Sequence, residues 1–179
     1  MQITENASLK LHNSFGIDVD CRYLVKLQNI KDIAEVLSAK QFRDIPRLIL
    51  GGGSNILFRN DYDGLVIMVS NLGINLIGED DHYFYVRAAA GENWHQFVQH
   101  CLQQGWAGLE NLSLIPGTVG AAPMQNIGAY GVELSDHFHA LSAIDLDSSE
   151  HLSFDREACQ FGYRDSLFKR QRGRYLITD

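Results

Sequence analysis

A run of five small and polar residues, Gly51, Gly52, Gly53, Ser54 and Asn55, follows a short apolar segment of the chain. Glycine tolerates positive φ, so three glycines in a row can turn successive backbone N–H groups toward an anion, and the serine and asparagine add side-chain donors. The run does not match the dinucleotide fingerprint, and no Gly-Lys-Ser/Thr sequence follows it as in a P-loop. It therefore predicts either a phosphate held by neutral donors without a lysine or a tight turn between two strands.

A longer loop at residues 115–131 has too few bulky side chains to build its own core and is too apolar for a solvated linker. Its glycines and prolines are Pro116, Gly117, Gly120, Pro123, Gly128 and Gly131. We expect its backbone to pack closely against something flat or anionic, with Gln125 and Asn126 as amide donors and acceptors. An Ω-loop that closes on itself is the alternative.

Arg164 lies between Tyr163 and Asp165 in the third segment of chemical interest. A guanidinium is a fixed fork of donors that suits a carboxylate or a developing oxyanion, whereas an ion-paired surface arginine is the plain alternative. The basic run that follows, residues 169–174, is typical of a solvated face. The alternative interpretation is that it attracts the phosphate of a nucleotide.

Other kinds of site find little support in the sequence. Cys21, Cys101 and Cys159 are widely spaced, which fits thiols of a reducing compartment better than a disulfide framework or a zinc site. His137 and His139 would share one face of a strand, but no nearby ligand set completes a metal site. The sequence contains no G-x-S-x-G nucleophile motif.

Length and charge narrow the class of protein further. A chain of 179 residues is long enough for one domain or for two small lobes that share a cleft. Its formal net charge of −7 argues against a nucleic-acid partner. No apolar stretch approaches the roughly 20 residues of a membrane helix, and the first residues lack the features of a signal peptide. We therefore expect a cytoplasmic protein without a membrane partner.

Hydrophobic periodicity predicts the elements that position these loops. In a first lobe, residues 1–62, strands at 21–27 and 47–50 flank a helix at 29–40. In a second lobe, residues 63–179, strands are expected at 65–70, 83–89, 138–146 and 174–179, and helices at 92–104 and 155–159. The last strand has barely begun where the sequence stops, which suggests a fragment of a longer protein.

The helix expected at residues 92–104 is amphipathic. Its apolar face consists of Trp94, Phe97, Val98, Cys101 and Leu102. Gly105 follows and is expected to end the helix, because glycine is the usual residue just beyond a helix C-terminus.

Taken together and in order, these motifs resemble the UDP-N-acetylenolpyruvoylglucosamine reductase family of flavoenzymes. The resemblance runs from about residue 9 to the end, and its most specific part is the loop that ends at Gly131. The segments that carry it are residues 13–18, 50–55, 90–94, 108–112, 115–120, 123–131 and 161–166.

The resemblance implies a fold and a set of functional residues. The fold is α+β, the two-lobed FAD-binding unit shared with vanillyl-alcohol oxidase and p-cresol methylhydroxylase. FAD is implied as the cofactor, with its pyrophosphate at residues 51–55 and its ring and ribityl chain along residues 115–131. The resemblance implies NADPH as the hydride donor and a nucleotide sugar bearing an enolpyruvyl group as the substrate, for peptidoglycan precursor synthesis. It assigns Arg164 to stabilising the charge that develops on the substrate.

The chain also departs from the family. Members of the family carry a further C-terminal domain, which covers the substrate and supplies the proton donor, and neither that domain nor its motifs occur in these 179 residues. We therefore expect a flavin-binding fragment that does not turn over alone. A non-catalytic FAD-binding module and another oxidoreductase built on the same unit are the alternatives, and the sequence does not indicate an oligomeric state.

Overall fold

A computed structural model describes residues 2–179, and the chain forms two compact units. The first unit ends at Asn71 and the second is Leu72–Asp179. The sequence predicts the division after residue 62. It lies later in the structure because the strand at residues 62–69 pairs with two strands of the first unit.

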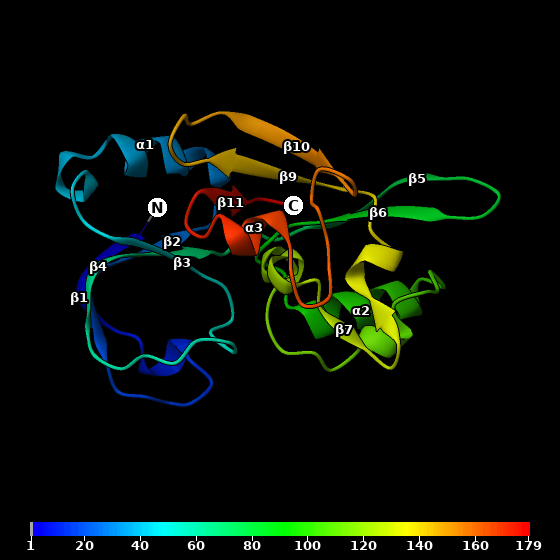
Figure 1. The fold of residues 1–179 in the computed structure, drawn as a ribbon, viewed down its shortest axis with the longest axis horizontal. Coiled ribbons are helices and arrows are strands. Elements are labelled where there is room, and N and C mark those ends of the chain that lie inside the picture. Colours follow the sequence, from blue (N-terminus) through cyan, green and yellow to red (C-terminus); the bar gives the residue numbers. More distant parts are fainter. Residues whose placement is uncertain (1) are drawn as a thin grey trace. The chain divides into compact units, whose positions relative to one another are not determined.

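A four-stranded sheet in the order β1-β2-β4-β3 forms the first unit (Figure 1). Its strands are β1 (Gln2–Ser8), β2 (Asp20–Leu27), β3 (Arg47–Leu50) and β4 (Tyr62–Val69). β1 is antiparallel to β2, and β4 runs parallel to both of its neighbours. Four consecutive buried residues in β4 are typical of a parallel strand that is covered on both faces. The structure confirms the strands predicted from residues 21–27 and 47–50.

The helix predicted at residues 29–40 is divided into three short pieces. A 3₁₀ turn, Ile30–Asp32, leads into α1 (Ile33–Ser38), and a second 3₁₀ turn, Lys40–Phe42, follows. Ala39 adopts an extended conformation between the last two pieces. This break buries Phe42, whose ring meets that of Tyr23 edge-on at a centroid distance of 5.2 Å.

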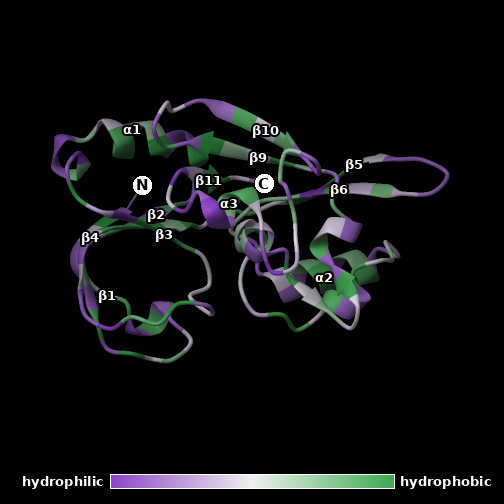
Figure 2. Cartoon of the chain, viewed as in Figure 1, coloured by the Kyte–Doolittle hydropathy of each residue, from purple (hydrophilic) through white to green (hydrophobic). Residues whose placement is uncertain are grey.

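Several small sheets and one longer helix build the second unit. β5 (Ile74–Glu79) and β6 (Phe84–Ala88) form a hairpin whose hydrophilic tip stands out in Figure 2. β9 (Ala140–Asp145) lies between β10 (His151–Asp155) and β11 (Tyr175–Ile177) in an antiparallel sheet. The remaining elements are α2 (Trp94–Gln103), β7 (Gly128–Ala129), β8 (Val132–Glu133) and α3 (Leu167–Arg170).

The core of the second unit forms around the apolar face of α2. Trp94, Phe97, Val98 and Cys101 are buried as predicted, whereas Leu102 is 44% exposed. The amide oxygen of Asn93 accepts a hydrogen bond from the Gln96 backbone N–H at 3.0 Å and caps the start of the helix. Gly105, with φ of +79°, follows its end.

The short helix predicted at residues 155–159 is wrong. Asp155 is the last residue of β10, and residues 156–160 form turns. The Asp155 carboxylate accepts the Ala158 backbone N–H at 2.8 Å, which favours a turn over a continuing helix. Among residues 2–179, no helix is both long and apolar enough to span a bilayer.

Candidate functional site

The glycine loop, residues 51–55, follows β3 in the first unit and packs against an earlier part of the same unit. Gly53 has φ of +66°, and a Cβ built on it would lie 2.0 Å from the His12 carbonyl oxygen. The Ser14 backbone N–H donates to the Gly53 carbonyl at 3.0 Å. Only glycine fits this position, because a side chain would meet backbone there and the conformation is left-handed.

A buried asparagine holds the segment that the glycine loop contacts. The amide of Asn13 donates to the Leu9 carbonyl at 2.8 Å and to the Ile17 carbonyl at 3.0 Å, and its oxygen accepts the Ile17 N–H. Residues 13–17 therefore form a fixed turn beside residues 51–55. Two motifs that lie far apart in the sequence become neighbours, while Gly52 stays exposed on the surface of the loop.

In the second unit, the central loop, residues 115–131, is joined along its first part to the segment before α2. The Val119 N–H donates to the Glu92 carbonyl and the Gly120 N–H donates to the Ala90 carbonyl, each at 2.9 Å. A Cβ on Gly120 would lie 2.6 Å from the Ala90 Cβ. Gly120 is thus a close-packing position, and its N–H is already bonded within the chain.

The end of the central loop is a small hairpin of β7 and β8. Ala129 pairs with Val132, and the two residues between them, Tyr130 and Gly131, have φ of +52° and +79°. Two left-handed residues are what a two-residue type I′ turn requires. This geometry leaves the Tyr130 side chain 88% exposed at the tip.

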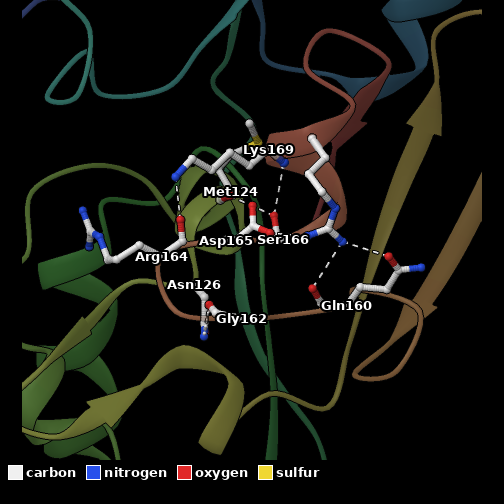
Figure 3. A network of polar contacts seen from close by, with 9 residues as sticks. Met124, Asn126, Gln160, Gly162, Arg164, Asp165, Ser166 and Lys169 are labelled. Atoms are coloured by element: carbon white, nitrogen blue, oxygen red, sulfur yellow. Dashed lines mark hydrogen bonds and ion pairs between the residues drawn. The ribbon is translucent and has the colours of Figure 1, made fainter.

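Asn126 is 1% exposed and lies beside Gly162 in Figure 3. Its amide nitrogen donates to the Glu133 carboxylate at 2.7 Å and to the Gly162 carbonyl at 3.2 Å. Its amide oxygen accepts the Ser135 backbone N–H at 3.0 Å. The sequence analysis assigned this amide to the cofactor, whereas the structure uses both of its N–H donors inside the second unit.

The arginine loop, residues 161–166, is a tight turn held at its base. Gly162 and Asp165 exchange backbone hydrogen bonds of 3.0 and 3.1 Å. Between them, Arg164 is exposed and has φ of +53°, and in Figure 3 its side chain extends away from Lys169 and Asp165. The guanidinium therefore projects from the surface on a backbone that has little freedom to move.

A serine and a lysine anchor the arginine loop to the rest of the unit. The hydroxyl of Ser166, a fully buried residue, donates to the Met124 carbonyl at 2.8 Å and accepts the Lys169 N–H at 3.2 Å, which caps α3. The Lys169 ammonium donates to the Arg164 carbonyl at 2.5 Å. Both residues lie in segments singled out from the sequence, but their anchoring role was not predicted, although a serine just before a helix is a recognisable capping signal.

The basic run after the arginine loop bonds largely to the chain itself. Arg170 pairs with Asp165, and its guanidinium donates to the Gln160 side-chain oxygen at 2.8 Å. Arg174 donates from two nitrogens to the Asp145 carboxylate, both at 2.9 Å. The Asp147 backbone N–H and then the Arg174 guanidinium hold the pKa of the Asp145 carboxyl below its usual range. These contacts favour a structural role for the run over the phosphate attraction considered from the sequence.

A family model described as an FAD binding domain matches residues 21–153. The chain belongs to this family. FAD as the cofactor, expected from the resemblance, is thereby confirmed.

Curated relatives match almost the whole chain. UDP-N-acetylenolpyruvoylglucosamine reductase from Azoarcus sp. (strain BH72) is 52% identical over 181 residues, and the protein of the same name from Pseudomonas putida (strain KT2440) is 51% identical over 177. Each alignment covers 99% of this chain and 52% of the relative. The chain thus spans about half the length of the curated relatives it matches.

Solved structures confirm the fold class. The chain superposes on UDP-N-acetylenolpyruvylglucosamine reductase from Thermus caldophilus with a TM-score of 0.75 at 23% identity, covering 99% of this chain and 59% of that one. It superposes on p-cresol methylhydroxylase with a TM-score of 0.62 at 13% identity, covering 98% of this chain and 35% of that one. The predicted α+β FAD-binding unit is therefore correct.

The two loops predicted to bind FAD suit such a ligand in residue type. Residues 51–58 and 116–131 contain no charged side chain, so no carboxylate of either loop would repel a diphosphate. Most side chains of the central loop are small, so they would permit close approach of a flat ring to its backbone. The individual contact residues in these loops remain predictions.

Proposed function

We propose that this chain is the flavin-binding half of a UDP-N-acetylenolpyruvoylglucosamine reductase. That enzyme would use NADPH to reduce the enolpyruvyl group of a UDP-linked sugar, giving UDP-N-acetylmuramate for peptidoglycan synthesis. One observation carries the proposal. In a chain that is 51–52% identical in sequence to relatives of that name, an exposed arginine lies on a loop that is hydrogen-bonded to the central loop. FAD, when bound, supplies the hydride transfer.

In this proposal the glycine loop holds the FAD diphosphate. Gly51, Gly52, Gly53, Ser54 and Asn55 offer neutral donors, and the loop contains no side chain that would compete with an anion. From the central loop we assign to the cofactor Pro116, Gly117, Gly120, Gln125, Gly128 and Gly131. Asn126, predicted from the sequence to contact the cofactor, is left out because its side-chain donors bond to Glu133 and Gly162. Gly120 would contribute close packing, because its N–H is already bonded to Ala90.

Arg164 would act on the substrate. A carboxylate lies beside the enolpyruvyl double bond and gains negative charge as that bond is reduced, and a fixed guanidinium can stabilise this charge without moving. Arg164 suits that task because its side chain is exposed and a hydrogen bond from Lys169 restrains its backbone. The proton that completes the reduction is not assigned to any residue of this chain.

Titration with FAD tests the first part of the proposal. We expect the purified protein to bind FAD, and Gly52→Val to weaken that binding by blocking close approach to the glycine loop. Gly78→Val is the control, because Gly78 lies in the β5–β6 hairpin, where a Cβ would make only an ordinary contact with Tyr85. Equal FAD affinity of Gly52→Val and the control would refute the phosphate assignment.

Half-reaction kinetics of the complete protein in which this chain occurs test the second part. Arg164→Ala should leave reduction of bound FAD by NADPH nearly unchanged and slow reoxidation by the enolpyruvyl substrate about 100-fold or more, as for loss of one oxyanion donor. Arg172→Ala removes an exposed arginine of the basic run that follows the arginine loop, and it should behave like the parent protein in both steps. If the parent binds FAD but the substrate never reoxidises it, the non-catalytic module or a different oxidoreductase is correct instead.

A further inference from the structure

Asn126 connects the central loop to the arginine loop through its buried side chain. The Asn126 nitrogen donates to Gly162, which lies 36 residues later in the sequence, and to Glu133. Glu133 is itself fixed, because its carboxylate and that of Asp136 each accept the other's backbone N–H. A chain of polar contacts therefore runs from the hairpin of β7 and β8, through Asn126, to the base of the arginine loop.

The contact at Gly162 reaches the arginine through the backbone of the turn. Gly162 and Asp165 are the hydrogen-bonded pair that closes the turn, and Arg164 sits within it in a left-handed conformation. A non-glycine residue holds such a backbone only where its surroundings impose it. Lys169 donates to the Arg164 carbonyl, so Asn126 and Lys169 both restrain the backbone that carries the arginine side chain.

We propose that Asn126 is a positioning residue: its N–H bond to Gly162, made by an amide that Glu133 and Ser135 hold in place, fixes the arginine loop relative to the central loop. Any effect on catalysis rests on the proposed function. The structural part of the proposal does not, since it concerns only contacts within Leu72–Asp179.

Two variants distinguish the contribution of the Asn126 side-chain amide from that of the backbone conformation at this position. Asn126→Gly removes the side chain and tolerates the φ of +45° at this position. Asn126→Asp keeps the shape and the acceptor for Ser135, but replaces both donors with an oxygen that faces the Glu133 carboxylate. Ile144→Val is the control for lost stability, because it removes one buried methyl group from β9.

Hydrogen–deuterium exchange of the 179-residue chain, without cofactor or substrate, gives the structural readout. We expect the peptide that covers residues 160–166 to exchange about tenfold faster or more in both Asn126 variants, because the bond that protects the Asp165 N–H opens more often. The peptide that covers β9 serves as the internal reference. In Ile144→Val the ratio of the two exchange rates should stay at the parent value. A parental ratio in Asn126→Asp would overturn the proposal, since it would mean that the donors do not hold the loop.

Half-reactions of the complete protein provide the catalytic readout. Both Asn126 variants should slow substrate-driven reoxidation by up to about 100-fold, the scale of an ångström-sized misplacement, while NADPH-driven reduction changes little. An equal loss in both steps would overturn the positioning role. Faster exchange in a protein that does not act on the enolpyruvyl substrate would leave Asn126 as the fixing residue and refute the proposed function alone.

Discussion

Substituting Gly53 tests whether the glycine loop and residues 12–14 meet as closely as the structure shows. Gly53→Ala imposes a left-handed conformation on alanine, which costs about 1–2 kcal/mol. Its Cβ would also lie 2.0 Å from the His12 carbonyl oxygen, so that the two segments must separate. Separation breaks the Ser14–Gly53 hydrogen bond, a further loss of about 1 kcal/mol. We expect a total loss of roughly 3 kcal/mol in the free energy of unfolding.

Gly16→Ala is the matched control for this substitution. Gly16 lies in the same unit and has φ of +63°, close to the +66° of Gly53, but nothing lies within 4 Å of a Cβ built there. It should therefore lose only the conformational part, about 1–2 kcal/mol. The difference between the two variants isolates the steric contribution of the contact with His12.

Urea unfolding followed by circular dichroism measures that difference. Both tryptophans, Trp94 and Trp106, belong to the second unit, so their fluorescence serves as the reference for that unit. With a slope of about 2 kcal/mol/M, the midpoint of Gly53→Ala should lie roughly 0.5–1 M below that of Gly16→Ala. Equal midpoints would refute the close approach, and with it the reason for glycine at this position.

Two further predictions concern buried and paired groups of the second unit. Burial raises the pKa of the Cys101 thiol to about 11 and that of the Cys159 thiol to about 12. We therefore expect neither thiol to react with a thiol reagent at pH 8 until the protein is unfolded. Rapid labelling of either cysteine in the native protein would contradict this. For Asp145, the folded pKa is lower than the unfolded one, so its contribution to stability is complete above the ordinary carboxyl pKa and is lost as pH falls toward the folded value. The stability difference between the parent and Asp145→Asn should therefore shrink below about pH 4. A difference that stays constant down to pH 2 would refute stabilisation of the ionised Asp145 carboxylate by the Asp147 N–H and then by Arg174.

The sequence predicted those parts of the fold that depend on local pattern. Alternating apolar residues identified β2, a short apolar run identified β3, and a helical repeat identified the buried face of α2. β1 escaped prediction because Ala7 is its only buried residue, so no alternation marks it and pairing with β2 defines it instead. The length of the helix predicted at residues 29–40 was overestimated, because burial of Phe42 outweighs local helix preference.

The sequence by itself determined the family, the cofactor and the fold class, because these depend on which residue types follow one another along the chain. It also identified Arg164 as the residue of chemical interest, a role that stays a prediction. Only the tertiary structure decided how the polar groups are used. Asn126 bonds to Gly162 and Ser166 bonds to Met124 across separations of 36 and 42 residues. A local pattern cannot specify which donor meets which acceptor at that distance, since packing of the whole unit brings the two groups together.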